Sequence, residues 1–471
     1  MPNRTTNPTD VINEMMTKMQ EMTEKLSEWV TNEPQTLEAI EKQVLGHIRA
    51  LGASLVAGLC SLSAPRYADT ERPCPHCGEQ AFLQRHRQVH VTTVLGDIRY
   101  TRPYYLCPQC HQGHAPLDDS LGACPGGISD GLHELCAFAG VREAFAEASD
   151  LLARLTLITV SPNTIRSAAE SVGAGIIAAE HESVTQAFAV SSPELPTSPT
   201  TLPERLYVSM DGNMVNTRED HWKENKLGAV YTTTTTPSKK RPDTLDIRAR
   251  DITFVTDFTD PETFGREVWL EACRRGGTMV SEIVAIGDGA PWIWNQIAEH
   301  FPDAIQILDW YHVTEYLWDA AHAIYGRDTD LSKQWAKQQL DQLWEGQVDA
   351  VLRALAEHAS KGEAVTNAIR YYTNNQSRMD YARYRDLGLQ VGSGTIESGC
   401  KHVIAHRLKQ AGMIWNLESA RAMAKARAWM KSGRWEEAMA LRLNRRRSYH
   451  RSEVAASSSG CPDISPQVVA A

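Results

Sequence analysis

The sequence lacks any run of about 18 consecutive apolar residues, the length that a membrane-spanning helix needs, so no membrane partner is expected. Its first residues, Met1-Pro2-Asn3-Arg4, also lack the apolar stretch of a secretory signal peptide. We therefore expect a cytoplasmic protein. In that compartment ten cysteines in 471 residues do not suggest a disulfide framework. Six cysteines are scattered, and we expect buried or inert thiols at Cys60, Cys124, Cys136, Cys273, Cys400 and Cys461.

The chain also lacks a positive net charge, since 48 Lys and Arg against 58 Asp and Glu give −10. That value alone argues against a nucleic-acid partner, but the charge is unevenly distributed. Between residues 401 and 451 the basic residues dominate, namely Arg407, Lys409, Arg421, Lys425, Arg427, Lys431, Arg434, Arg442 and Arg445-Arg446-Arg447. Such a local face can neutralise phosphates, and we expect it to contact DNA. A solvated helix surface is the alternative.

The length of the chain exceeds what one hydrophobic core organises, and about three domains of roughly 150 residues are expected. Changes of pattern and composition place the boundaries as follows: an N-terminal helical region 1–65, a zinc-ribbon-like domain 66–125, a helix-turn-helix-like region 126–190, a linker 191–203 rich in Ser, Pro and Thr, an α/β catalytic domain 204–430 with an all-α insertion at about 313–390, and a basic helix end with a disordered tail 431–471.

Residues 9–60 show the apolar spacing of two helices. In the first, the spacing alternates between three and four residues, as in a coiled-coil seam, at Ile12, Met15, Met19, Met22, Leu26 and Trp29. The pattern is short and stops near Pro34, which favours packing within its own domain; a dimer contact is the alternative. The second helix is predicted through Leu37, Ile40, Val44, Ile48, Leu51 and Leu55.

Two Cys-x-x-Cys pairs, Cys74 with Cys77 and Cys107 with Cys110, supply the four thiolates of a closed tetrahedral zinc site. Alternating apolar residues on both sides of Gly96-Asp97 predict a β-hairpin with a glycine turn between the two pairs. Four protein ligands leave no open coordination position, so the expected zinc is structural.

A helix-turn-helix-like pattern follows in residues 129–187. Ser161 as N-cap and Pro162 at the first helical position begin a helix that opens on Asn163, Thr164 and Arg166. A helix, a short turn and such a helix suit DNA binding. Any helical hairpin gives a similar pattern, so packing alone is the alternative.

Three acidic residues stand beside apolar runs in settings rich in glycine or serine. Asp211 follows Leu206–Met210, Asp288 follows Ile283–Ile286, and Glu397 follows Gly392-Ser393-Gly394. The first two are expected at strand ends and the third at the start of a helix. Three such carboxylates, in a site that we expect to be free of cysteine, can hold two Mg²⁺ or Mn²⁺ ions for in-line displacement at a phosphodiester. Taken singly, each acid is also explained as a turn or helix-start residue.

The order of elements around these acids favours a ribonuclease H-like core. Three strands are predicted at residues 205–210, 226–234 and 245–255, followed by a helix, a short apolar strand at 283–286, a second helix and a strand at 304–308. In open α/β sheets, sites lie beyond the carboxyl ends of strands at a switch point, where Asp211 and Asp288 are expected. A long helical insertion separates Asp288 from Glu397.

These motifs resemble those of a known family. The blocks Met210-Asp211-Gly212, Gly287-Asp288-Gly289, Asp309-Trp310-Tyr311-His312 and Gly394-Thr395-Ile396-Glu397-Ser398 look like those of the transposases of bacterial ISKra-type insertion sequences, near the Mutator-like branch of the DDE transposases. The resemblance covers nearly the whole chain. It implies a metal-binding triad of Asp211, Asp288 and Glu397, supported by Asp309 and His312. It also implies a bacterial, nucleoid-associated enzyme that cuts element ends and joins them to target DNA.

Two other functions fit the same residues. One is a DNA-binding regulator that keeps the zinc and helix-turn-helix regions without catalysis, and the other is a structure-specific nuclease that cuts branched DNA without joining it. Because two element ends must be paired, we expect a homodimer or a larger assembly on DNA.

Overall fold

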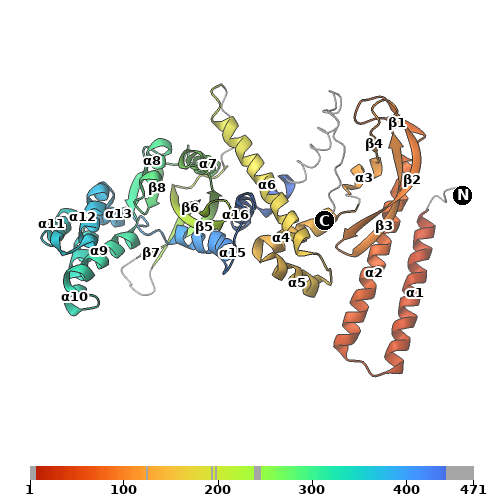
Figure 1. Ribbon diagram of the computed structural model, residues 1–471, viewed down its shortest axis with the longest axis horizontal. Helices are drawn as coiled ribbons and strands as arrows, with labels where there is room; N and C mark the ends of the chain where they lie inside the picture. Colours follow the sequence, from red (N-terminus) through yellow and green to blue (C-terminus); the bar gives the residue numbers. More distant parts are fainter. Residues whose placement is uncertain (1–6, 124–125, 192–194, 197–198, 238–244, 442–471) are drawn as a thin grey trace. The chain divides into compact units, whose positions relative to one another are not determined.

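The computed structural model describes residues 7–123, 126–191, 195–196, 199–237 and 245–441. The chain divides into two units, the first extending to Ala169 and the second comprising Glu170–Ala438 (Figure 1). The boundary lies inside helix α6 (Pro162–Ala187). Parts of the expected linker 191–203, and residues 442–471 of the expected basic helix end and disordered tail, lie outside the described residues.

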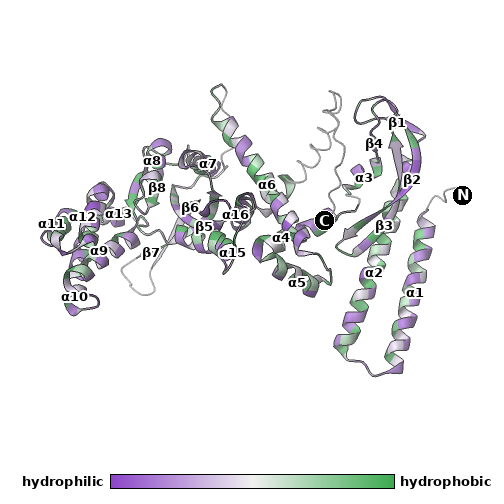
Figure 2. Ribbon diagram, viewed as in Figure 1, coloured by the Kyte–Doolittle hydropathy of each residue, from purple (hydrophilic) through white to green (hydrophobic). Residues whose placement is uncertain are grey.

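The first unit begins with the two predicted helices, α1 (Pro8–Asn32) and α2 (Leu37–Ser63), which pack against each other. Asn7 and Asp10 form a capping box that satisfies the free N–H groups at the start of α1. Hydrophobic and hydrophilic residues are mixed along both helices (Figure 2). Each helix buries a single residue, Val11 in α1 and Ala53 in α2. Their apolar spacing is therefore only partly used by packing within this chain.

One segment, Leu37–Tyr67, has the length and apolar composition of a membrane span, which the absence of a continuous apolar run did not indicate. Length and composition do not separate such a span from a helix that packs on protein. Here Ala53 of α2 packs in a core with Val91, Ile98 and Tyr100 of the neighbouring sheet. That contact uses one face of α2, and little of the segment is fully buried.

The neighbouring sheet is antiparallel, in the order β1-β2-β3-β4. Its strands are β1 (Glu71–Pro73), β2 (Gln80–Thr93), β3 (Gly96–Leu106) and β4 (Gly113–His114). The predicted hairpin is confirmed, with its turn shifted by two residues. Thr93 pairs with Gly96, so residues 94–95 form the turn and the glycine begins β3.

Short helices complete the first unit and lead into the second. They are 3₁₀ helix η1 (Ala64–Tyr67), α3 (Pro116–Leu121), α4 (Asp130–Arg142) and α5 (Phe145–Thr156), followed by α6. Leu157, in the left-handed region with φ 56°, ends α5. The predicted cap of α6 is confirmed, because the Ser161 hydroxyl accepts from the Thr164 N–H at 3.1 Å.

The second unit is built on a five-stranded mixed sheet in the order β7-β6-β5-β8-β9. The strands are β5 (Arg205–Thr217), β6 (His221–Pro237), β7 (Leu245–Asp257), β8 (Glu282–Gly287) and β9 (Ile305–Leu308). β5, β6 and β7 pair antiparallel, whereas β8 and β9 run parallel to β5. The predicted strand order along the chain is confirmed.

Both faces of this sheet are covered. A side chain at Gly228 would meet Val268 of α7 (Pro261–Arg274), and a side chain at Gly399 would meet Phe254 and Leu227. Because Leu227 and Gly228 are consecutive in a strand, they point to opposite faces. α7 therefore packs on one face and the segment around Gly399 on the other.

Helices make up the rest of the second unit. They are α8 (Pro291–His300), the inserted helices α9 (Trp310–Tyr325), α10 (Asp330–Trp344), α11 (Val348–Ala356), α12 (Glu363–Asn375) and α13 (Tyr381–Asp386), with 3₁₀ turns η2 (Ala359–Lys361) and η3 (Gln376–Arg378), and then α14 (Gly394–Gly399), π-helix η4 (Cys400–Ala405), α15 (His406–Leu408) and α16 (Leu417–Lys431). The predicted helical insertion begins at Trp310, three residues earlier than expected, because Asp309 caps α9.

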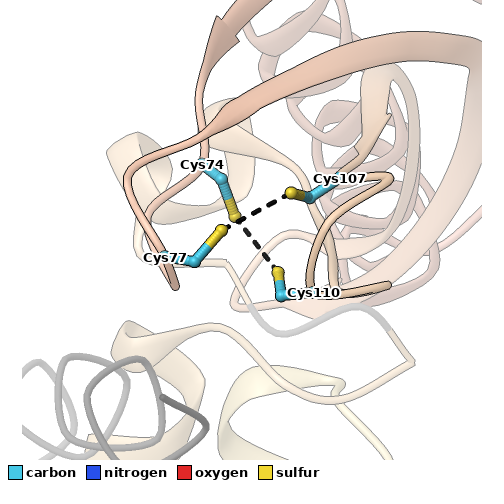
Figure 3. A group of neighbouring side chains, drawn as sticks. All are labelled: Cys74, Cys77, Cys107 and Cys110. Carbon is cyan, nitrogen blue, oxygen red and sulfur yellow. Dashed lines mark hydrogen bonds between the residues drawn. The ribbon is translucent and has the colours of Figure 1, made fainter.

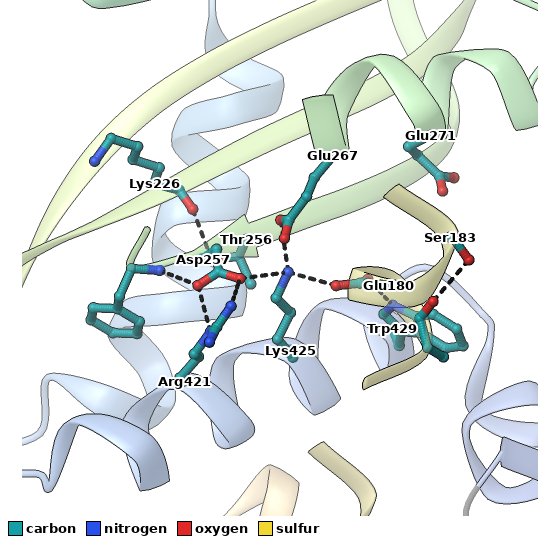
Figure 4. A network of polar contacts seen from close by, with 12 residues as sticks. Glu180, Ser183, Lys226, Thr256, Asp257, Glu267, Glu271, Arg421, Lys425 and Trp429 are labelled. Atoms are coloured by element: carbon teal, nitrogen blue, oxygen red, sulfur yellow. Dashed lines mark hydrogen bonds and ion pairs between the residues drawn. The ribbon is translucent and has the colours of Figure 1, made fainter. Parts of the chain in front are cut away.

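The expected DNA-binding face around α16 is wrong for several of its residues. Arg407, Lys425 and Arg427 are buried, with exposed fractions of 1%, 1% and 3%. Lys425 Nζ lies 2.5 Å, 2.9 Å and 2.7 Å from carboxylate oxygens of Glu180, Asp257 and Glu267 (Figure 4). These cations hold the unit together and do not face phosphates. Arg442 and Arg445-Arg446-Arg447 lie outside the described residues.

Candidate functional site

Two similar turns carry the four cysteines of the first unit. In the first turn the Cys74 N–H donates to the Glu79 carbonyl and the Gly78 N–H donates to the Cys74 carbonyl. The second turn repeats both bonds, with Cys107 bonded to Gln112 and His111. Gly78 and His111 occupy the equivalent position and both have positive φ, 78° and 57°. The sequence thus builds the same thiol-presenting knuckle twice.

The four sulfur atoms form one cluster (Figure 3). All lie within 4.8 Å of one another, and the Sγ atoms of Cys74 and Cys110, like those of Cys77 and Cys107, are 3.6 Å apart. A tetrahedral ion with Zn–S bonds of about 2.3 Å separates its sulfur ligands by roughly 3.8 Å. Backbone hydrogen bonding, chiefly from Cys110, lowers the pKa of Cys107 to about 7, whereas burial raises the pKa of Cys110. Against the backbone hydrogen bond from Glu79, burial and the neighbouring thiols raise the pKa of Cys77 to about 12. The cluster can hold a metal ion such as zinc.

In the second unit, the sheet register aligns three aspartates. Ser209 of β5 pairs with Ile286 of β8, and Ile286 pairs with Ile307 of β9. Two residues further along each chain stand Asp211, Asp288 and Asp309. These three therefore form one row at the carboxyl edge of the parallel strands, with Asp211 inside β5 and with Asp288 and Asp309 directly after the ends of β8 and β9.

The position of Asp211 differs from the prediction. It does not end its strand, because β5 continues to Thr217 as the partner of β6. Only the parallel partner β8 stops, at Gly287. The strand end that creates the site is therefore that of β8, and β5 passes through the site.

Asp309 connects the sheet edge to the turn that precedes Glu397. Its carboxylate is fully buried, and its Oδ1 accepts from the Ser393 N–H at 2.7 Å. The Ser393 hydroxyl in turn donates to Glu397 Oε1 at 3.1 Å. Two residues that are far apart in the sequence, Asp309 and Glu397, are thus joined through one serine.

Asp309 also holds His312. The Nδ1 atom of His312 lies 2.6 Å from Asp309 Oδ2, and the His312 backbone N–H donates to the same oxygen. This hydrogen bond, opposed by burial and reinforced by the charge of Asp309, raises the pKa of His312 to about 9. The imidazole is therefore protonated at neutral pH, with Nδ1 engaged and Nε2 available as a second donor.

Electrostatic coupling links the side chains of the row. Burial raises the pKa of Asp211, the nearby charge of Asp288 adds to the rise, and His312 opposes it. Burial and the charges of Asp211 and Glu397 raise the pKa of the Cys400 thiol well above its usual range. Asp211, Asp288 and Glu397 are each partly exposed, so the cluster is open to solvent.

The carboxylates are spread more widely than the cysteines. Over the part of the chain that the structure describes, the four cysteines are the only group of three or more Cys, His, Asp and Glu whose ligand atoms all lie within 4.8 Å. The acids form a row with a flanking helix and do not form a closed cage for one ion.

The sequence interpretation missed three residues at this site. Cys400 Sγ lies 3.2 Å from Asp211 Oδ2, so the expected cysteine-free site has a cysteine beside it, although the thiol is buried as predicted. Asn213 donates to the same sulfur, and the Tyr371 hydroxyl donates to the Asp288 carbonyl at 2.6 Å. A helical step of three from Glu397 was the available signal for Cys400. Nothing local marked Tyr371, which comes from the inserted helix α12.

The comparisons with known proteins agree on one family. The profile described as "Uncharacterised protein family (UPF0236)" matches residues 31–444. One relative, from Caldanaerobacter subterraneus subsp. tengcongensis, is a UPF0236 protein whose name joins eleven locus designations; it is 24% identical over 373 residues, which cover 75% of this chain and 70% of the relative. UPF0236 protein TTE2489 of the same organism is 23% identical over 370 residues, 75% of this chain and 71% of its own. The chain belongs to the UPF0236 family.

Proposed function

We propose that the protein is a DNA transposase of the DDE type, which cuts the ends of a mobile DNA element and joins them to target DNA. The observation that carries this proposal is the row of Asp211 and Asp288 at the edge of a mixed β7-β6-β5-β8-β9 sheet, with Glu397 brought to it by Ser393 and Asp309. Three antiparallel strands followed by two parallel ones is the arrangement expected of a ribonuclease H-like core. The resemblance of the sequence blocks to ISKra-type transposases supports the same conclusion.

The family comparison adds a second kind of support. One relative bears eleven locus designations within one genome. A gene that spreads with a mobile element is expected at many loci, whereas a regulator is expected at few. As a transposase, this protein would act on DNA inside a bacterial cell and would pair two element ends as a dimer or larger assembly.

The donor set of the site fits hard divalent cations. Asp211, Asp288 and Glu397 offer carboxylate oxygens, which Mg²⁺ and Mn²⁺ prefer, and the Cys400 thiol stays protonated. When bound by these carboxylates, two such ions would activate an attacking water or 3′-hydroxyl and stabilise the leaving oxygen. Asp211, on the central strand β5 of the sheet, would be the ligand common to both ions, and Asp288 and Glu397 would each hold one.

In this proposal, His312 binds the scissile phosphate and Asp309 positions His312. Asp309 keeps His312 protonated and oriented, so Nε2–H presents a positive donor where a scissile phosphate oxygen would lie. In the first unit, the four cysteines would hold a structural zinc ion, because four thiolates complete a tetrahedral shell.

The test uses the full-length protein with Mg²⁺ and labelled duplexes that carry the inverted repeats flanking its coding region. Asp211→Asn is expected to lower cleavage by about 10³-fold, since loss of several kcal/mol of transition-state stabilisation is at stake. Asp303→Asn, which removes an exposed carboxylate elsewhere in the same unit, is the matched control and should cut normally. Equal cutting by Asp211→Asn contradicts the assignment.

Two further outcomes separate the alternatives. End binding without metal-dependent nicking by the wild-type protein identifies a regulator without catalysis. Nicking of branched DNA without joined products identifies a nuclease.

A further inference from the structure

Cys400 connects Asp211 on β5 with the helix that carries Glu397. It lies three residues after Glu397, at the point where α14 ends and a π-helical segment, Cys400–Ala405, begins. A single π-helical turn within a helix is frequent at functional sites, because it redirects side chains that an α-helix would place elsewhere. Cys400 is buried, with an exposed fraction of 8%, yet its sulfur faces polar atoms.

The contacts of the sulfur atom have a defined direction. Asn213 Nδ2 donates to Cys400 Sγ at 2.8 Å, which uses the sulfur as an acceptor. The thiol hydrogen is then free to be donated to Asp211 Oδ2, 3.2 Å away. Asn213 lies two residues beyond Asp211 on β5, on the same side of the strand. Two side chains of one strand therefore hold one thiol of the helix that carries Glu397.

The other oxygen of Asp211 is fixed as well. Oδ1 accepts from the Gly212 N–H at 2.7 Å, while Oδ2 accepts from Cys400. Each carboxylate oxygen keeps further lone-pair capacity, so the bonds orient the group without saturating it. The plane of the Asp211 carboxylate is set before any ion arrives.

We infer that Cys400 is a positioning residue that orients the Asp211 carboxylate for divalent metal ions and ties it to the helix of Glu397. This inference rests on the proposed function of the same site. Substitutions at Cys400 can distinguish this positioning role from simple packing. A serine hydroxyl can accept from Asn213 and donate to Asp211 as the thiol does, whereas alanine can do neither. If the thiol only fills space, alanine is tolerated and a buried serine is the worse replacement.

The experiment measures Mn²⁺ binding to the full-length protein without DNA, by electron paramagnetic resonance of free Mn²⁺ and by calorimetry. Cys400→Ala is expected to weaken Mn²⁺ binding about 10-fold or more, the range seen when groups behind a metal ligand are lost. Cys400→Ser should recover most of the affinity. Cys273→Ala, which removes another buried thiol of the same unit, is the control and should bind as the wild-type protein does.

Cleavage assays supply a second readout. Cys400→Ala should raise the Mn²⁺ concentration for half-maximal cleavage by a similar factor, with the rate at saturating Mn²⁺ within about threefold, because the lost interaction acts on metal binding. Thermal unfolding of Cys400→Ala compared with Cys273→Ala shows whether the variant is folded.

The outcomes separate this inference from the proposed function. If the wild-type protein binds Mn²⁺, Asp211→Ala does not, and Cys400→Ala matches the wild type, the positioning role is overturned and the metal site stands. A serine variant that binds more weakly than the alanine variant also overturns it. If wild-type and Asp211→Ala proteins bind Mn²⁺ equally, the proposed function itself fails.

Discussion

The four-cysteine cluster of the first unit and the carboxylate row of the second are built in opposite ways. The cysteines come from two copies of one local turn, 33 residues apart from Cys74 to Cys107, and their sulfurs already lie within 4.8 Å. Asp211 and Asp288 come from adjacent strands and Glu397 from a helix that follows a long insertion, and these three carboxylates remain partly exposed. A closed set of ligands suits an ion that holds a fold together. An open row leaves space for substrate and for ions that bind with it.

The second unit contains its own contrasting cluster. Glu180, Asp257 and Glu267 are also three acids brought together, but Lys425 fills the space between them. Burial raises the pKa of Glu267, whereas Lys425 and Arg421 overcome the effect of burial on Asp257 and lower its pKa. Three carboxylates around a buried ammonium form a structural core. The three carboxylates of the open site are partly exposed and have the imidazole of His312 as their cationic neighbour, which under the proposed function leaves carboxylate oxygens available to metal ions.

Breaking the closed cluster should have the largest effect. Cys107→Ser removes one ligand of a structural ion whose binding contributes on the order of 10 kcal/mol in zinc-dependent domains. We expect loss of bound zinc, measured by elemental analysis, and loss of protection from hydrogen exchange in β2 and β3. Cys60→Ser, at a partly buried thiol of the same unit, should change neither. Retention of one zinc per chain and of native protection in Cys107→Ser contradicts this account.

The filled acid cluster provides the next test. Lys425→Met leaves Glu180 and Glu267 buried without their cation and Asp257 with Arg421 alone, which should destabilise the second unit by about 3–5 kcal/mol. Denaturant unfolding measures the loss, with Lys401→Met at an exposed position as the control. A change below about 1 kcal/mol would show that the acids are protonated or hydrated in the native protein.

Within the open site, Asp309 should affect activity through its hydrogen bonds to His312 and Ser393. Asp309→Asn weakens the bond to His312 and to Ser393, so His312 should titrate near its ordinary pKa. Loss of a group behind the reacting residues costs about 10–100-fold in activity. Nuclear magnetic resonance follows the imidazole titration while cleavage assays follow the rate. An unchanged titration would mean that Asp309 does not control His312.

The smallest expected effect is the pH dependence of the metal-free protein. The pKa of His312 is raised to about 9 in the folded state. A raised pKa gives stability that is complete below the unfolded pKa of about 6.5 and is lost as pH rises through the folded value. We expect a loss on the order of 1–2 kcal/mol between pH 6.5 and 9, discounted because the side chain is partly exposed. His312→Gln should remove this part of the pH profile.

Local chemistry made most elements predictable. Ser161 and Pro162 fixed the start of α6, and the apolar run in β8 marked a central strand. The cysteine spacing identified its cluster because the two turns are local. The length of β5 beyond Asp211 was not predictable in this way, since its polar residues are paired by β6.

Long-range pairing explains the failures. A count of basic residues indicated a phosphate-binding face, but it could not show that Asp257 and Glu267 meet Arg421 and Lys425 across more than 150 residues. Likewise, the position of Cys400 beside Asp211 was not predicted, because its partners, Asp211 and Asn213, lie on a distant strand. Chemistry assembled by tertiary structure is visible only once the strands and helices are placed.

Anomalous diffraction from a crystal soaked in Mn²⁺ would decide whether Asp211, Asp288 and Glu397 form one site for two divalent ions. We expect two peaks roughly 3.5–4 Å apart at the carboxyl edge of β8, within bonding distance of these three carboxylates. Manganese peaks elsewhere, with none touching Asp211, would mean that these carboxylates are not the metal site.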